Sequence, residues 1–271
     1  KLSVNSKISD RVRVTRIEVV PVQMAAQDGL TDDFFLRKSA GLYPDVMQPL
    51  EENKRLIITS NLKSLMVEVD TRELDAGSYP MTFCFDTNEA SYCDTFTLEV
   101  IDVELPEQDT TFTQWLHCDS LKDYYHTEAF DERHWEIIEN FGKTAVRYGV
   151  NMLLTPIFTP PIDTYVGGER PTMQLVGVSK NGNTYSFDFS LLDRWVEMCD
   201  RIGVKYFEIS HLFTQWGAKA APKIMATVGG EYKRIFGWET DALSMEYDEF
   251  LRAFIPAFLE HMKSLDGADK R

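Results

Sequence analysis

The fold is decided by residues 204–218, which read VKYFEISHLFTQWGA. Within them, the β-rich run at 206–209 follows a helical pattern at 191–202 that stops at Gly203, a residue typical of the position just past a helix. Three polar or aromatic side chains come directly after the run: His211, Gln215 and Trp216. Because α/β barrels carry their chemistry on the loops that follow the strands, this pattern predicts a site at the carboxyl end of a strand.

The three side chains have complementary chemistry. An indole offers a flat apolar face, and a carboxamide and an imidazole both donate and accept hydrogen bonds. Together they favour stacking on a carbohydrate and hydrogen bonding to its hydroxyl groups, with Trp216 as the expected platform. Ordinary packing within the loop is the alternative that the sequence leaves open.

Strands and helices alternate through the second part of the chain, which predicts a parallel sheet with crossover helices. The expected strands are 112–117, 150–155 and 204–209. The expected helices are 130–148, 191–202 and 247–265, the last with Pro256 inside it. Residues 172–178 and 184–189 form an expected excursion that turns at Asn181-Gly182.

A complete (β/α)8 TIM barrel needs eight strands, eight helices and about 250 residues. Only three of each are expected in residues 110–271, so we interpret this region as the amino-terminal part of a TIM barrel and expect the chain to be a fragment of a longer protein. The first domain, residues 1–105, reads instead as strands with period-two alternation, at 12–22, 56–60, 65–69, 79–86 and 92–103. This pattern predicts an antiparallel β-sandwich, with residues 37–52 as a long irregular loop. The whole chain is therefore expected to be a multidomain protein, with a β domain followed by an α/β domain.

Composition and charge limit the partners. The 271-residue chain has 43 acidic and 28 basic side chains, a formal net charge of −15, which repels nucleic-acid phosphates and anionic lipids. It has no run of 18 apolar residues and no apolar segment of signal-peptide length at its start. We therefore expect a soluble protein that binds neither nucleic acid nor membrane, with the cytoplasm as the first expectation. The sequence leaves the oligomeric state open.

The four cysteines, Cys84, Cys93, Cys118 and Cys199, show no C-x-x-C spacing, so neither a zinc site nor a redox motif is indicated. Cys84 and Cys93 are the plausible pair across a hairpin, and free thiols are the alternative. The run His117-Cys118-Asp119 does not predict a chelating block, because successive residues of a strand point to opposite faces. We expect no metal ion and no cofactor.

Further candidate site residues follow the other two expected strands. His117 lies at the end of the first, and Asp163 and Arg170 lie in the long loop after the second. Because the carboxyl ends of parallel strands meet at one face, we expect these residues to converge with those after the third strand. Asp163 and Arg170 have a second interpretation, in which they pair with each other across Gly167-Gly168 and fix the shape of the loop.

Glycoside hydrolysis ordinarily needs two carboxyl groups. The adjacent pairs Asp131-Glu132 and Asp248-Glu249 both lie at expected helix starts, where capping is the favoured role. The role of Glu208, inside the third strand, is left open, and we assign no catalytic residue to this chain.

Three long motifs resemble glycoside hydrolase family 123 and its wider relatives. They are TPIFTPPIDT at 155–164, GERPTMQLV at 168–176, and SHLFTQWGA at 210–218 followed by APK at 221–223. The segment GLYPD at 41–45 and the GSY approach to a strand at 77–79 are similar to the amino-terminal sandwich of the family.

The resemblance implies an exo-acting, retaining β-N-acetylgalactosaminidase that acts on an amino-sugar glycoside, whose own 2-acetamido oxygen attacks the anomeric carbon. It also implies an Asp-Glu pair at a later strand end, which we expect to follow the end of this chain. His117, Asp163, Arg170, His211, Gln215 and Trp216 would then contact substrate without catalysing its cleavage. A non-catalytic carbohydrate-binding protein on the same scaffold is the alternative.

Overall fold

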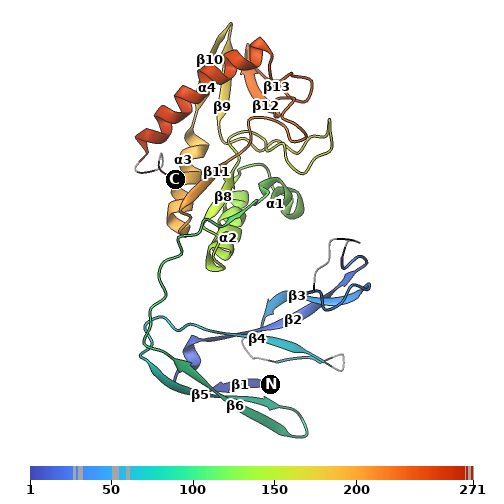
Figure 1. Ribbon diagram of the computed structural model, residues 1–271, viewed down its shortest axis with the longest axis vertical. Coiled ribbons are helices and arrows are strands. Elements are labelled where there is room, and N and C mark those ends of the chain that lie inside the picture. Colours follow the sequence, from blue (N-terminus) through green and yellow to red (C-terminus); the bar gives the residue numbers. More distant parts are fainter. Residues whose placement is uncertain are drawn as a thin grey trace. The chain divides into compact units, whose positions relative to one another are not determined.

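The computed structural model describes residues 1–26, 29, 33–50, 55–58, 62–265, 267 and 270. The chain divides into two compact units, Lys1–Pro106 and Glu107–Arg271, and each has its own apolar core. Figure 1 shows antiparallel strands in the first unit, and helices and strands together in the second. The chain is thus a β unit followed by an α/β unit.

Two antiparallel sheets form the described part of the first unit. One contains β1 (Leu2–Asn5), β5 (Gly77–Asp86) and β6 (Ser91–Val100), in the order β1-β5-β6. The other contains β3 (Gly41–Pro49), β2 (Val12–Val22) and β4 (Ser64–Val69), in the order β3-β2-β4, and the short 3-10 helix η1 (Ser9–Arg11) precedes β2. Alternate residues of β5, namely Tyr79, Met81 and Phe83, are buried in the core, as period two requires. Side chains of both sheets pack around this core, as in a β-sandwich.

The expectation of an irregular loop at 37–52 is wrong, because β3 occupies most of this range. The two prolines of β3 weaken its strand pattern in the sequence. Pro44 pairs with Val19 beside a register shift at Glu18/Val19, and β3 is an edge strand of its sheet. Edges and bulges are the places where a strand tolerates a residue without a backbone N–H. Of the strand expected at 56–60, residues 56–58 are not a strand, and residues 59 and 60 lie outside the described part of the chain.

Cys84 and Cys93 form a disulfide. They are directly opposite each other in the β5–β6 pairing, which brings their Cα atoms to 4.1 Å. The hairpin geometry therefore settles which of the two alternatives holds. Cys118 and Cys199 are buried and take no part in this disulfide.

The second unit contains a parallel sheet of three short strands in its described residues. They are β7 (Thr113–Gln114), β8 (Met152–Thr155) and β11 (Tyr206–Ile209), in the order β11-β8-β7. The helices are α1 (Cys118–Tyr125), α2 (Glu132–Arg147), α3 (Ser190–Ile202) and α4 (Met245–Ser264). None of the helices in the described part is long and apolar enough to cross a membrane.

A second sheet accompanies the parallel one, formed by β10 (Thr184–Asp188), β9 (Gly177–Asn181), β12 (Ile224–Val228) and β13 (Glu231–Phe236), in that order. The expected β9–β10 hairpin is present, and its turn lies at Gly182-Asn183, one residue later than expected, because Asn181 pairs with Thr184. The β12–β13 hairpin was missed, although Gly229-Gly230 at its turn is a hairpin signal. Strand β12 of this hairpin pairs with β9, and this pairing fixes the end of the segment that follows β11.

Helix α2 begins where its sequence signals place it. The Asp131 carboxylate accepts the backbone N–H of His134 at 2.7 Å, and both helix geometry and dipole favour that cap. The His134 ring is buried between α2 and α1. Its Nδ1 accepts the N–H of Phe130 at 2.9 Å, so its Nε2 carries the proton donated to the carbonyl of Cys118. Burial lowers the pKa of His134, which keeps this neutral form.

The expected strand at 112–117 is only partly right. β7 ends at Gln114, and the chain then turns, because the N–H of Leu116 bonds back to the carbonyl of Gln114. His117 is the extended residue that precedes α1, a helix that the sequence patterns did not reveal. This early helix start is what points Asp119 into the site described below.

Glu139 on α2 links α2 to α3. Its carboxylate binds Arg201 on α3 at 2.6 Å and Lys143 at 2.7 Å, and the two cations, Arg201 first, lower its pKa to about 2. A lowered carboxyl pKa contributes stability above the unfolded-state pKa, near 4.5, and loses it as the pH falls towards 2. We expect Glu139→Gln to lower the free energy of unfolding by up to about 1 kcal/mol at pH 7, since solvent screens its partly exposed ion pairs, and by much less at pH 2.

Thermal unfolding followed by circular dichroism between pH 2 and 7 measures this difference. The exposed Glu249→Gln is the matched charge control, and it should leave the pH dependence unchanged. Identical pH profiles for Glu139→Gln and the parent would contradict the role given to this ion pair.

Candidate functional site

Two adjoining hollows lie at the carboxyl ends of the parallel strands. The polar hollow, of about 480 Å³, is lined by Thr113, Gln114, Trp115, His117, Asp163 and Glu208. The apolar hollow, of about 380 Å³, is lined by Trp115, Ile162, His211, Leu212, Phe213, Thr214, Gln215 and Ala218. Each has the volume of a small-molecule site, and Trp115 borders both. The indole of Trp115 also lies edge-on to the His211 ring, with centroids 6.1 Å apart.

Glu208 links the outer strands of the parallel sheet. It lies on β11, and its carboxylate accepts the hydroxyl of Thr113 on β7 at 2.5 Å and the indole N–H of Trp115 at 2.8 Å. Since β8 lies between β7 and β11, the Glu208 side chain spans the middle strand. The sequence left the role of Glu208 open, and the structure places it in the wall of the polar hollow.

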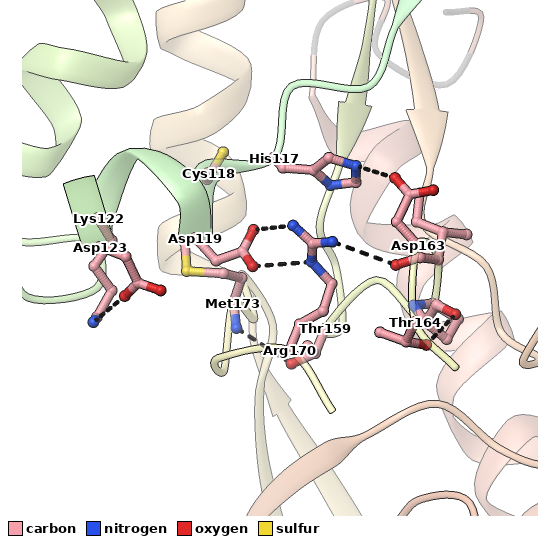
Figure 2. A network of polar contacts seen from close by, with 12 residues as sticks. His117, Cys118, Asp119, Lys122, Asp123, Thr159, Asp163, Thr164, Arg170 and Met173 are labelled. Carbon is pink, nitrogen blue, oxygen red and sulfur yellow. Dashed lines mark hydrogen bonds and ion pairs between the residues drawn. The ribbon is translucent and has the colours of Figure 1, made fainter. Parts of the chain in front are cut away.

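His117 and Asp163 meet in the polar hollow. The Nε2 atom of His117 is 2.8 Å from a carboxylate oxygen of Asp163, as Figure 2 shows. Asp163 has a left-handed backbone, with φ of 57°, a conformation that Asp tolerates better than most residues. The bond joins the start of α1 to the loop after β8, and so brings together two of the expected strand-end regions.

Asp119 and Arg170 form the most buried ion pair of the site. The guanidinium of Arg170 binds the Asp119 carboxylate twice, at 2.9 and 3.0 Å, and also donates to the carbonyl of Ile162 at 3.5 Å (Figure 2). The Asp119 side chain is 9% exposed and that of Arg170 is 15% exposed. The expected pairing of Asp163 with Arg170 is wrong, because His117 and Asp119 are their respective partners.

The loop at 163–170 is held from its other side as well. The side chains of Gln215 and Trp216 both donate to the carbonyl of Thr164, at 2.8 and 3.1 Å. The indole of Trp238 donates to the carbonyl of Gly168 at 2.7 Å, and Lys223 donates to that of Arg170 at 3.3 Å. Burial lowers the pKa of Lys223, which also pairs with Glu169. The segment after β11 is thus a scaffold for the loop after β8.

The six expected site residues divide into two groups. His117, Asp163, His211 and Gln215 line the hollows. Arg170 and Trp216 line neither, and their contacts support the loop instead. Sequence reasoning selected neither Trp115 nor Asp119, and it left Glu208 unassigned. The signal for Glu208 was its even spacing from Tyr206, which puts both on one face of a strand.

The arrangement offers an aromatic ring, two carboxylates and an imidazole around an open polar hollow, with an apolar hollow beside it. Such a surface can stack on a flat apolar face and accept hydrogen bonds from hydroxyl groups. In the described residues, no group of three or more His, Cys, Asp or Glu side chains is arranged to hold a metal ion.

Comparisons with known proteins give the region a family likeness. Residues 115–270 match the family model described as Glycoside hydrolase 123, catalytic domain. Among solved structures, the chain is similar to a family 123 glycoside hydrolase from Clostridium perfringens, studied for glycolipid glycan hydrolysis, with a TM-score of 0.69 and 15% identity. That likeness covers 97% of this chain and 47% of the other, so the chain spans about half of its length. No curated protein matches the sequence.

The Asp119–Arg170 pair generates a stability prediction. Removing one partner of a buried ion pair leaves an uncompensated charge, so we expect Asp119→Asn to lower the free energy of unfolding of the second unit by about 2 to 4 kcal/mol. Arg170→Lys should cost nearly as much, since an ammonium cannot reproduce the two parallel bonds. Urea unfolding followed by tryptophan fluorescence measures both. Lys122→Ala, at an exposed ion pair on the same helix, is the control, and equal losses in all three variants would refute the special role of the pair.

Proposed function

The chain belongs to glycoside hydrolase family 123, and from this premise we propose that its protein is an exo-acting, retaining β-N-acetylgalactosaminidase. The observation that carries the proposal is the pair of hollows around Trp115, which lies inside the matched catalytic region and at the carboxyl ends of parallel strands. An exposed indole beside carboxylates and an imidazole is a surface that can hold a sugar ring and its hydroxyl groups. The proposed substrate is an amino-sugar glycoside.

In the proposed reaction the 2-acetamido oxygen of the substrate attacks the anomeric carbon while a carboxylic acid protonates the leaving oxygen. A second carboxylate polarises the acetamide, and water then opens the cyclic intermediate with net retention. Such a pair must be free to reach the substrate. The carboxylates described in or beside the polar hollow are all engaged, Asp119 by Arg170, Asp163 by His117 and Glu208 by Trp115.

The two adjacent Asp-Glu pairs of the chain lie at helix starts, and three of their four carboxylates have partners. Asp131 caps α2, and Glu132 binds Arg194, whose hydrogen bonds and then charge lower the Glu132 pKa. Asp248 binds Arg252 within α4. We therefore propose that the catalytic Asp-Glu pair lies outside residues 1–271. We also propose that β7, β8 and β11 are strands of a (β/α)8 barrel, which the parallel order of strands close in sequence supports.

The engagement of every one of these carboxylates also favours a second function, a carbohydrate-binding protein without hydrolytic activity. The two functions share the same stacking ring and hydrogen-bonding groups. They differ in whether the full-length protein supplies an acid pair within reach of the polar hollow.

Hydrolysis of an aryl β-N-acetylgalactosaminide tests the proposal. We expect residues 1–271 alone to release no aryl alcohol and the full-length protein to release it, because neither acid nor acetamide-orienting group is available in the shorter chain. The aryl β-N-acetylglucosaminide serves as the control for sugar identity. Hydrolysis by residues 1–271 at the full-length rate would place the acids within this chain, with Glu208 and Asp119 as first candidates. Binding of the sugar without hydrolysis by the full-length protein would support the second function.

The Cys84–Cys93 disulfide supports an oxidising compartment rather than the cytoplasm. Its bond closes a short segment, with a sequence separation of 9. We expect Cys84→Ser with Cys93→Ser to lower the free energy of unfolding of the first unit by about 2 to 3 kcal/mol, from the loop-closure entropy. Peptide mapping of the protein from its native source without reductant should find the two cysteines joined. Two free thiols in that protein would instead favour the cytoplasm as its compartment.

A further inference from the structure

Trp115 is the aromatic ring shared by the two hollows. It is 43% exposed, although its only polar group, the indole N–H, is bonded to Glu208 at 2.8 Å. The exposed part of the side chain is therefore aromatic carbon. A fixed aromatic surface at the border of a cavity is where the C–H face of a sugar ring gains contact without exposing an unpaired polar group.

Glu208 fixes the orientation of this ring. One carboxylate oxygen accepts the Trp115 N–H and the other accepts the Thr113 hydroxyl at 2.5 Å. Bonds of this kind, with an ionised acceptor, are stronger than neutral ones, so rotation of the indole is opposed. Both oxygens are occupied, one by Thr113 on β7 and the other by Trp115 just after it, which makes Glu208 a positioning residue and not a proton donor.

The charged side chains that line the polar hollow are acidic. Two of its six lining residues, Glu208 and Asp163, are carboxylates, and neither Lys nor Arg is among them. The one imidazole among the six lining residues, that of His117, is bonded to Asp163. Arg170 is close in sequence to Asp163, but its guanidinium is bound to Asp119. A carboxylated or sulfated sugar in this hollow would meet like charges without a partner.

Building on the proposed function, we propose that Trp115 is the platform on which a neutral or amino sugar stacks, that Glu208 positions its ring, and that Glu208 and Asp163 exclude acidic sugars. The proposal transfers the platform role from Trp216, which the sequence favours. Trp216 lines neither hollow, and its N–H is bonded to the backbone of the loop at Thr164.

Titration calorimetry of residues 1–271 with N-acetylgalactosamine tests the platform. We expect Trp115→Ala to weaken binding about tenfold or more, because the ring on which the sugar stacks is lost, and Trp216→Ala to weaken it less. Tyr124→Ala removes an aromatic ring that is 77% exposed on α1, and it should bind as the parent does. Parent affinity in Trp115→Ala, or a larger loss in Trp216→Ala, would overturn the assignment.

Two substitutions at position 208 separate positioning from charge. In Glu208→Gln the amide oxygen can still accept the Trp115 N–H, so N-acetylgalactosamine affinity should stay within about threefold of the parent. Galacturonic acid, which the parent should bind at least about tenfold more weakly than N-acetylgalactosamine, should bind Glu208→Gln more tightly than the parent. Glu208→Ala should lose N-acetylgalactosamine affinity as Trp115→Ala does. Unchanged galacturonic acid affinity in Glu208→Gln would overturn the charge role.

The indole ¹⁵N–¹H signals of the protein provide a readout that needs no sugar. The signal that disappears in Trp115→Phe belongs to Trp115, and it should move upfield in Glu208→Ala and keep its hydrogen-bonded position in Glu208→Gln. An unmoved signal in Glu208→Ala overturns the positioning role by itself. If the parent binds neither sugar while the signal moves as expected, the proposed function fails and takes the platform role with it, whereas the contact between Glu208 and Trp115 stands.

Discussion

The buried ion pair between Asp119 and Arg170 is the interaction on which the site depends. It joins the first turn of α1 to the far end of the loop after β8, two segments 51 residues apart in sequence. Removing two charges from water is costly, and the cost is offset only where geometry allows parallel hydrogen bonds. The planar guanidinium meets that condition, and its remaining N–H groups reach the carbonyl of Ile162. With both ends of the loop fixed, Asp163 is held against His117 at the edge of the polar hollow.

The elements that the sequence predicted well are those with local signals. Helix α3 ends at Gly203, which has the left-handed backbone expected there, and α2 begins after a carboxylate cap at Asp131. The strands that it placed poorly depend on partners distant in sequence. β3 carries two prolines and pairs with β2, and β7, expected at 112–117, keeps only the two residues that pair with β8. Neither segment has a periodic pattern long enough to define its strand.

The same distinction applies to the candidate site. Convergence of His117, Asp163, His211 and Gln215 followed from strand order, since parallel strands end at one face. The individual contacts did not follow, because hydrogen-bond partners are chosen by side-chain geometry. Asp163 and Arg170 have opposite charges and lie seven residues apart, yet each binds a residue near α1. Trp216 looked like a platform from its neighbours, and in the fold its N–H supports a loop.

The other four tryptophans of the second unit show why residue type alone does not assign a role. Trp135 and Trp195 are buried in the core, Trp238 holds the backbone at Gly168, and Trp216 holds it at Thr164. Trp115 differs from them because its N–H is bonded to a side chain and its ring borders two hollows. Burial removes the ring faces of Trp135 and Trp195 from solvent, and the exposed ring of Trp216 borders neither hollow. Recognition of a ligand thus depends on how the polar end of an aromatic side chain is satisfied, and Glu208 meets that need from within the sheet.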